Sequence, residues 1–469
     1  MASTAPTGTS GENIGHVVFI TAAAAIGGFL FGYDSAVING AVTGIEKNFD
    51  VGPVQTGFVV AIALLGSALG AWIAGGLADH WGRTRAMQVA AILFAVSSVG
   101  QALPFALWDL ALWRVLAGVG IGMASVIGPA YIAEVAPPAY RGRLGSFQQL
   151  AIVLGIAVSQ LVNYAIAERA GGDVNNELLG LQAWQWMLGA CLVPALLYLV
   201  FATVIPESPR FLIAVGKTDA ARKVLSEVEG EETDLDARLA EIETSVRSER
   251  RPRLRDLRGS RFGLMPIVWI GILLSVFQQF VGINVIFYYS ASLWQSVGIN
   301  QSDSLLISFS TSIINLVGTF IAIALVDRIG RRPLLLIGSA GMTAALAVAA
   351  WAFSAGVPSG EAVKLPETQG TVALIAAHVF VLFFALSWGV IVWVLLGEMF
   401  PNRVRAAALS VAAAAQWVAN WLITVSFPSL SEWNLAGAYV GYAAFAALSF
   451  VFVLFKVRET KGRKLEEMG

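Results

Sequence analysis

Three uncharged amide side chains within one strongly apolar stretch suggest chemistry inside a membrane. The stretch covers residues 264–293, longer than the ~20 residues that a bilayer-spanning helix needs, and it contains Gln278, Gln279 and Asn284. Amides are costly in lipid, so they should face protein or a water-filled cavity. On a straight helix Asn284 would point away from both glutamines, but Gly282 allows a break that brings the amides together. The pattern predicts either a polar binding site or hydrogen bonding between helices.

Two opposite charges also lie inside apolar stretches. Asp34 is far into the first stretch and Arg114 is inside the fourth. A lone charge at mid-membrane costs about 2.5–3.5 kcal/mol on insertion scales, and opposite charges attract more strongly in apolar surroundings than in water. We therefore expect an Asp34–Arg114 pair. It is either a fixed structural clamp or a proton-coupling site, in which movement of Arg114 lets Asp34 take a proton and later release it.

The composition indicates an integral membrane protein. Of 469 residues, 57% are hydrophobic and only 13% are charged, whereas soluble proteins are usually about one quarter charged. The formal net charge of −1 suggests no nucleic-acid partner. One cysteine and three scattered histidines give neither a disulfide framework nor a metal site. Without a phosphate-binding loop or a nucleophile paired with a base, we expect no cofactor, no ATP-driven pumping and no enzyme activity.

Apolar runs of bilayer length occur about twelve times, and an even number places both termini on one side. The connections after runs two, four, eight and ten, together with the tail, hold fourteen lysines and arginines, against three in the opposite connections. Basic residues favour the cytoplasmic side. We therefore expect a multi-pass cell-membrane protein with both termini cytoplasmic. The runs lie near residues 16–42, 54–78, 86–105, 108–133, 144–166, 184–205, 264–293, 305–326, 333–354, 371–397, 406–428 and 436–455.

A polar, partly helical segment divides the chain into two similar halves. An aspartate followed by arginine comes after runs two and eight, and a glutamate followed by arginine comes after runs four and ten. Such an internal duplication predicts two bundles that rock about a central site. The expected units are a six-helix bundle at 14–206, a cytoplasmic helical linker at 207–262, a second six-helix bundle at 263–458 and a cytoplasmic tail at 459–469.

The chain resembles the sugar porters of the major facilitator superfamily over about residues 14–465. The residues that carry the resemblance are Gly32-Tyr33-Asp34, the Asp79…Arg83 and Asp327…Arg332 loops, Pro206-Glu207-Ser208-Pro209-Arg210, Gln278-Gln279…Gly282-Ile283-Asn284 and Glu459-Thr460-Lys461-Gly462. Gly32-Tyr33-Asp34 and the segment 416–420 are most similar to bacterial proton-coupled monosaccharide symporters of the glucose and xylose type. One departure is Ile323, where a glycine is usual. The resemblance implies an all-α membrane protein with twelve transmembrane helices in two pseudo-symmetric six-helix bundles.

The resemblance also implies a sugar site. Amides both donate and accept hydrogen bonds, so they match sugar hydroxyls without burying charge. The implied contacts are Gln149, Gln278, Gln279, Asn284, Asn315 and Asn420, with Trp393 under the ring, Gln416, Trp388 and Trp417 as neighbours, and Ile156 facing the same site. Gln160 and Asn163 fall near the Gln149 face of the same helix. The alternative, hydrogen bonding between helices, applies above all to Gln160, Asn163 and Gln416.

Charged residues at the expected cytoplasmic face form candidate gates. Surface ion pairs are each worth ~0–1 kcal/mol, but two networks together can bias an equilibrium between outward-open and inward-open states. The alternative is that these arginines only set the topology. On the outer side, Tyr288 and Tyr289 are either an occluding gate or simple interfacial aromatics. The candidate cytoplasmic gate residues are Asp79, Arg83, Glu134, Arg143, Glu207, Arg210, Asp327, Arg331, Glu398 and Arg405.

These features predict secondary active import of a monosaccharide, D-glucose or a related hexose, by proton symport with alternating access. We expect a functional monomer in the lipid bilayer. One alternative is an uncoupled sugar uniporter. From other classes, a membrane sugar sensor usually needs a large cytoplasmic tail, whereas about a dozen residues follow the last run, and a membrane-embedded enzyme lacks a catalytic constellation.

Overall fold

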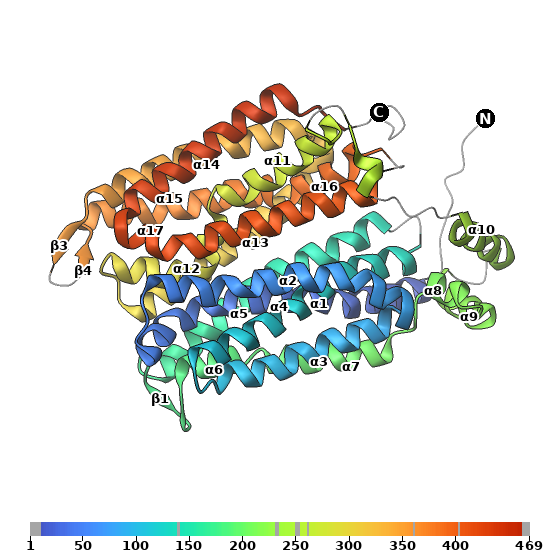
Figure 1. Cartoon of the computed structure of the whole chain (residues 1–469), viewed down its shortest axis with the longest axis horizontal. Coiled ribbons are helices and arrows are strands. Elements are labelled where there is room, and N and C mark those ends of the chain that lie inside the picture. Colours follow the sequence, from blue (N-terminus) through green and yellow to red (C-terminus); the bar gives the residue numbers. More distant parts are fainter. Residues whose placement is uncertain are drawn as a thin grey trace.

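The chain forms two helical bundles that lie side by side. The computed structural model describes residues 11–137, 141–229, 234–248, 254–259, 262–359, 362–401 and 404–461. Figure 1 shows the first bundle in blue to green and the second in yellow to red. The first contains α1 (Gly11–Phe49), α2 (Pro53–Trp81), α3 (Arg83–Ala102), α4 (Leu107–Val135), α5 (Arg141–Arg169), α6 (Ala183–Gly189) and α7 (Leu192–Val204). The second contains α11 (Pro266–Phe280), α12 (Ile283–Ser296), α13 (Gln301–Ile329), α14 (Arg331–Ser354), α15 (Glu367–Ala385), α16 (Trp388–Met399) and α17 (Arg405–Lys456).

The twelve expected spans are all present, although some are broken and two are merged. Within the described residues, ten helical segments are long and apolar enough to cross a membrane. The 52-residue α17 is two helices joined at Asn434, whose φ of −163° and ψ of 92° are not helical. The 20-residue α3 is less apolar, but at 1.5 Å per residue it is about 30 Å long and still spans the hydrocarbon core. The pairs α6–α7, α11–α12 and α15–α16 each form one interrupted span.

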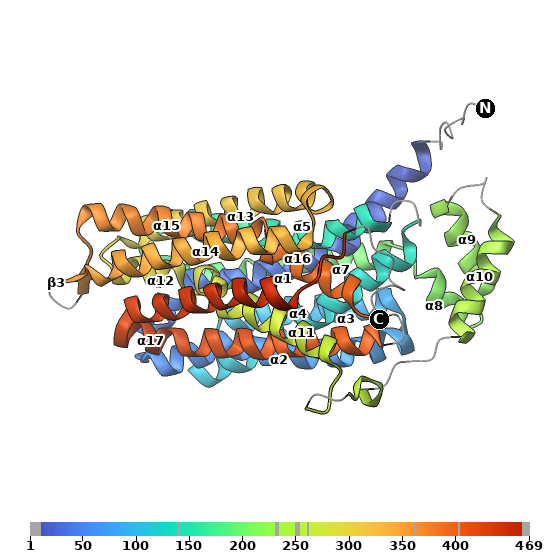
Figure 2. The ribbon, with the colours of Figure 1, turned by 90° about the horizontal axis from the view of Figure 1, so that it is seen from above.

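The two ends of the molecule differ. At one end, which we call the hairpin end, lie the antiparallel pairs β1 (Glu177–Leu178) with β2 (Leu181–Gln182) and β3 (Val357–Ser359) with β4 (Ala362–Lys364). At the other, the linker end, lie α8 (Pro209–Ala214), α9 (Thr218–Glu229) and α10 (Leu235–Ser248), and both views show this separation (Figures 1 and 2). The short 3-10 helix η1 (Leu254–Leu257) precedes α11. The strands were not expected from the sequence. The helices α8, α9 and α10 lie in the linker between the two bundles.

Close helix packing positions the buried acid of the first bundle. A Cβ on Gly32 would lie 1.9 Å from the Ile152 carbonyl oxygen, and one on Gly155 would lie 2.1 Å from the Phe29 carbonyl oxygen. Glycines at both positions therefore let α1 and α5 touch backbone to backbone, as small residues do in membrane helix pairs. Gly32 thus holds the α1 segment that carries Asp34 against α5.

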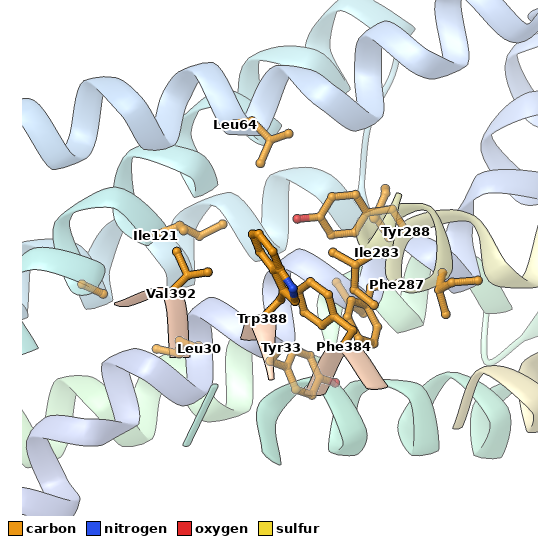
Figure 3. Close-up of a cluster of buried hydrophobic side chains, with 14 of the residues drawn as sticks. Leu30, Tyr33, Leu64, Ile121, Ile283, Phe287, Tyr288, Phe384, Trp388 and Val392 are labelled. Atoms are coloured by element: carbon orange, nitrogen blue, oxygen red, sulfur yellow. The ribbon is translucent and has the colours of Figure 1, made fainter. Parts of the chain in front are cut away.

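Apolar side chains from both bundles meet at the centre of the molecule. α1 packs on α12, α2 packs on α17, and α5 packs on α13. Figure 3 shows the central cluster, in which aromatic side chains from α12, α15 and α16 face α1, α2 and α4. The labelled members are Leu30, Tyr33, Leu64, Ile121, Ile283, Phe287, Tyr288, Phe384, Trp388 and Val392.

Candidate functional site

The span that contains the three amides is broken at Gly282. Gly282 has φ +84° and ψ 20°, a left-handed conformation that favours glycine, and it separates α11 from α12. The break places Asn284 Nδ2 2.5 Å from Gln279 Oε1, to which it donates. Gln279 Nε2 in turn donates to Gln278 Oε1 at 3.5 Å. The three amides therefore form one hydrogen-bonded chain, which a straight helix would not allow.

The amide of Gln278 is hydrogen-bonded to neighbouring helices. Its Nε2 donates to the Trp388 carbonyl at 2.8 Å, and its Oε1 accepts from Gln416 Nε2 at 2.6 Å. The side chain is 2% exposed. Gln278 and Gln416 therefore connect α11, α16 and α17 in this state. Gln279 and Asn284, by contrast, make their shortest hydrogen bond with each other, at 2.5 Å.

The remaining candidate sugar contacts occupy different environments. Asn315 on α13 and Asn420 on α17 are buried, and Asn420 Oδ1 accepts from Thr424 Oγ1 at 3.0 Å. Gln149 and Ile156 on α5 are half-buried. Among the described residues, no hydrogen bond joins Gln149 to the amides around Gly282. The structure thus brings Gln278, Gln279, Asn284 and Gln416 into direct contact, and it leaves Gln149, Asn315 and Asn420 as separate polar positions.

Two further amides of α5 hold helices together. Gln160 Nε2 donates to the carbonyls of Ala36 at 3.3 Å and Phe287 at 3.4 Å, and Asn163 Nδ2 donates to the Val37 carbonyl at 3.1 Å. Asn39 Nδ2 donates to Gln160 Oε1 at 3.0 Å. The alternative role of hydrogen bonding between helices therefore describes Gln160 and Asn163 here.

The three candidate tryptophans differ in exposure. Trp388 is fully buried, and its indole N–H donates to Ser339 Oγ at 2.9 Å. Trp417 lies against Phe31 of the other bundle, with ring centroids 6.0 Å apart. Trp393 is 40% exposed, so its ring is available to a ligand or to lipid.

Asp34 and Arg114 meet, but only loosely. The two side chains are 1% and 2% exposed, and Arg114 Nη1 lies 3.8 Å from Asp34 Oδ2. This separation is too long for a hydrogen bond. Arg114 instead donates to the Val60 carbonyl at 3.2 Å and to Gln101 Oε1 at 3.5 Å. Among the described residues, Asp34 Oδ2 has no hydrogen-bond partner. The geometry is that of an electrostatic pair without a direct bond.

Two neighbours of this pair were not predicted. The side chains of Gln101 and Cys191 both contact the Asp34 carboxyl group. Gln101 is the penultimate residue of α3, and Cys191 directly precedes α7. The only available signal was the presence of polar residues inside or beside apolar runs, which does not tell a coupling site from ordinary packing.

At the linker end, Arg83 is the centre of a network in the first bundle. Its guanidinium binds Glu134 at 2.9 Å and lies 3.3 Å from Asp79. Its backbone N–H donates to Glu207 at 2.9 Å, and Ser208 Oγ donates to Glu134 at 2.5 Å. The network therefore joins the starts of α3 and α8 to the end of α4.

The second bundle repeats this network. Arg331 binds Glu398 through two bonds, Nη2–Oε1 at 2.6 Å and Nε–Oε2 at 2.9 Å, and its Nη1 lies 3.0 Å from Asp327. Its backbone N–H donates to Glu459 at 3.1 Å, and Thr460 Oγ1 donates to Glu398 at 2.6 Å. Glu459 and Thr460 correspond to Glu207 and Ser208 of the first network. Glu207 was a candidate gate residue. The sequence motifs also contained Ser208, Glu459 and Thr460, but their place in the networks was not foreseen.

A carboxylate covers the start of a helix in both networks. Gly82 and Gly330, which precede α3 and α14, have φ of 101° and 104°, and a Cβ there would lie 2.3 Å from Glu207 Oε2 and 2.7 Å from Glu459 Oε2. Burial alone would raise the pKa of the Glu459 carboxyl group. Four backbone N–H groups, those of Lys461, Arg331, Arg332 and Thr460, donate to it and hold its pKa below the usual value. Each carboxylate thus meets the positive end of a helix.

The remaining candidate gate residues are Arg143, Arg210 and Arg405. The side chain of Arg143 lies outside the described residues, and Arg210 is half-buried on α8. Arg405 donates from Nε and Nη2 to the Phe400 carbonyl at 3.2 Å and 3.1 Å. Within the described part of the linker end, the ion pairs of Arg83 and Arg331 each stay inside one bundle.

The two bundles are hydrogen-bonded to each other toward the hairpin end. The Ala291 N–H donates to Asn39 Oδ1 at 2.9 Å, and Gln160 reaches the Phe287 carbonyl. The Val174 N–H donates to Gln301 Oε1 at 2.7 Å. Asn39 and Gln301 were not singled out from the sequence. These bonds close the hairpin end across the boundary between the bundles.

Tyr288 and Tyr289 lie inside this closed region. They are 6% and 1% exposed, which excludes the interfacial position that was their alternative. The Tyr289 hydroxyl donates to the Thr424 carbonyl at 2.8 Å. The Tyr288 hydroxyl lies beside Ser35 of α1 and Asn420 of α17, so it contacts both bundles.

Comparisons with known proteins find that this chain is similar to sugar transporters. Residues 20–469 match the family described as "Sugar (and other) transporter". A glucose transport protein of Synechocystis sp. is 52% identical over 461 residues, covering 98% of each chain. A D-xylose-proton symporter of Escherichia coli K12 is 36% identical over 490 residues, covering 97% of this chain and 96% of the relative. The inward open structure of the E. coli xylose transporter is similar with a TM-score of 0.82 at 35% identity, covering 96% of this chain and 99% of that one.

Proposed function

Because the chain belongs to the sugar transporter family of the major facilitator superfamily, we propose that it imports a monosaccharide together with a proton. Family membership confirms the predicted twelve-span fold, and it confirms the prediction of a transporter rather than an enzyme. The relative at 52% identity is named a glucose transport protein, which favours D-glucose or a related hexose. The relatives named proton symporters favour coupling to a proton.

The observation that carries this proposal is the pairing of a neutral amide cluster with a buried acid. The amides of Gln278, Gln279 and Asn284 can match sugar hydroxyls without a buried charge. Gln149, Asn315 and Asn420 complete the site from other helices, with Trp393 under the sugar ring and Ile156, Trp388 and Gln416 around it. Asp34 and Arg114, buried and not directly bonded, form the proton-coupling site. The amides bind the sugar, and the acid changes its charge during the cycle.

Alternating access follows from the two bundles. The moving units are residues 14–206 and 263–458, connected by the cytoplasmic linker 207–262 and followed by the tail 459–469. The excess of lysine and arginine assigns the linker end and both termini to the cytoplasm. Since hydrogen bonds join the bundles at the hairpin end, this conformation is closed toward the outside. The protein works as a monomer in the cell membrane, and Tyr288 and Tyr289 shield the sugar from the outer side.

The test is transport by the purified protein in liposomes, with a pH-sensitive dye in the external medium. Adding D-glucose outside should make the external medium more alkaline as sugar and protons enter together, and a protonophore should abolish accumulation. Competition with pentoses, other hexoses and polyols identifies the substrate class. Uptake of labelled sugar without proton movement would favour the uniporter alternative, and binding without uptake would favour the sensor.

The networks at the linker end act as the cytoplasmic gate, and Glu398→Gln tests this role. In the outward-facing state the charged residues of the two bundles approach each other and close the inside. Removing one charge weakens pairs that are worth about 1.5–3 kcal/mol when both partners are partly buried and hydrogen-bonded. We expect turnover to fall by about three- to tenfold with little change in KM, because Glu398 does not contact the sugar. The measurement is initial uptake rate against sugar concentration.

The control for the gate is Asp303→Asn, which removes an exposed carboxylate at the hairpin end. It should leave both kinetic parameters near their original values. A large rise in KM with unchanged turnover in Glu398→Gln would contradict the gate role. So would equal effects of the two substitutions.

A further inference from the structure

Gln101, near the end of α3, contacts both members of the buried charge pair. Its Oε1 accepts a hydrogen bond from Arg114 Nη1 at 3.5 Å, and its side chain lies beside the Asp34 carboxyl group. Gln101 is 1% exposed. Gln101 is therefore an uncharged neighbour of both groups and a hydrogen-bond acceptor for Arg114.

The hydrogen bond from Arg114 to Gln101 helps to explain why the two charges are close but not bonded. Direct arginine–carboxylate bonds are usually 2.7–2.9 Å long, whereas Arg114 Nη1 lies 3.8 Å from Asp34 Oδ2. The hydrogen bonds of Arg114 go to Gln101 and to the Val60 carbonyl, which are both uncharged. The guanidinium group is thus held by neutral acceptors on α2 and α3, at one side of the acid.

Such an arrangement lowers the cost of neutralising the acid. Removing the charge of one partner of a tight buried pair leaves the other charge uncompensated, which is strongly unfavourable. The hydrogen bonds of Arg114 to Gln101 and Val60, however, do not involve Asp34, so protonation of the acid removes neither of them. We propose that Gln101 is a positioning residue for proton coupling, an inference that rests on the proposed function. Gln101 holds Arg114 beside Asp34 without a direct bond between the two charges, and so lets the acid exchange its proton.

The other polar groups around Asp34 are uncharged. Tyr33 is its neighbour on α1, Cys191 approaches from the start of α7, and Tyr288 approaches from α12. Tyr289 of α12 lies in the same region, and its hydroxyl donates to the Thr424 carbonyl. Phenol and thiol groups stay neutral in apolar surroundings. Among the described residues, Arg114 is therefore the charge that acts on Asp34, and its position determines how readily the acid takes a proton.

Two substitutions of Gln101 should shift the pH dependence of uptake in opposite directions. Gln101→Leu removes an acceptor, so Arg114 turns to Asp34 and favours its charged form; the midpoint of sugar uptake against pH should move about one unit lower. Gln101→Glu supplies a carboxylate that binds Arg114 and repels charge on Asp34, so the midpoint should move about one unit higher. The measurement is the initial rate at saturating sugar, in liposomes, across a range of external pH.

The controls separate positioning from structure. Gln88→Leu removes another amide of α3, which donates to the Ala202 carbonyl at 3.1 Å, away from the pair; its midpoint should not move. Unshifted midpoints, or shifts of both Gln101 variants in one direction, would overturn the proposal even if rates fall. If Gln101→Leu does not fold, Gln101→Glu is still a sufficient test, because an unshifted midpoint in that variant would by itself contradict the proposal. If the unmodified protein moves no protons with sugar, the proposed function fails instead.

Discussion

Asp34→Asn should transport sugar only down its concentration gradient. Asparagine has nearly the shape of the protonated acid and cannot release a proton, so the sugar site can still turn over without coupling. For a 1:1 symporter, each pH unit across the membrane supports about tenfold accumulation, and 100 mV adds about 2.3 kcal/mol per charge. We therefore expect about 100-fold accumulation by the unmodified protein at a gradient of two pH units. The variant should give an internal-to-external ratio of about one.

The same preparation provides the control for this prediction. Exchange of labelled against unlabelled sugar needs no net proton movement, so Asp34→Asn should retain most of its exchange rate. Retained exchange shows that the variant is folded and that Arg114, still bound to Gln101 and Val60, tolerates the neutral neighbour. Asp34→Glu keeps a titratable group and should accumulate sugar at least partly. Accumulation against a gradient by Asp34→Asn would show that the pair is a structural clamp.

The fold could be predicted from the sequence because lipid restricts the backbone structure of every spanning segment. Every spanning segment must satisfy its backbone within a helix, so the apolar runs located the twelve spans despite the breaks within three of them. The basic residues and the repeated acidic–basic loops indicated the duplication. In the structure, Arg83 and Arg331 have equivalent partners in the two linker-end networks. Glu207 and Glu459 each accept from the backbone N–H of the arginine in their network.

Helix geometry explains which parts of the site could be anticipated. Gly282 between amides predicted the break, because only a bend could bring Asn284 to Gln279. The contacts of Gln101 and Asn39 depend on which helix lies opposite, and no local pattern encodes that. Gln160 and Asn163 share a face of α5 with Gln149, but in the structure they bond to α1. Their partners, too, depend on which helix lies opposite.

Gln279→Ala should weaken sugar binding more than it weakens the fold. A neutral hydrogen bond contributes about 0.5–1.5 kcal/mol net, and an amide that serves two sugar hydroxyls supplies two of them. The half-saturation concentration should therefore rise roughly 10- to 100-fold, since each 1.4 kcal/mol is a factor of ten. The measurements are the KM for uptake and the thermal midpoint in detergent, with and without sugar.

The contrast between neighbouring amides makes this prediction specific to binding. Gln278 is bonded to Trp388 and Gln416 on other helices, so Gln278→Ala should lower the thermal midpoint as well as the affinity. Gln279 is bonded to Asn284 and, at 3.5 Å, to Gln278, both within its own interrupted span, so its loss leaves the packing of α11 on α16 and α17 intact. Gln185→Ala, which removes an amide bonded to the Ala102 carbonyl at 2.8 Å, should lower stability and leave KM unchanged. A Gln279→Ala variant that loses stability and keeps its KM would assign these amides to helix association, and the sugar site would have to lie elsewhere.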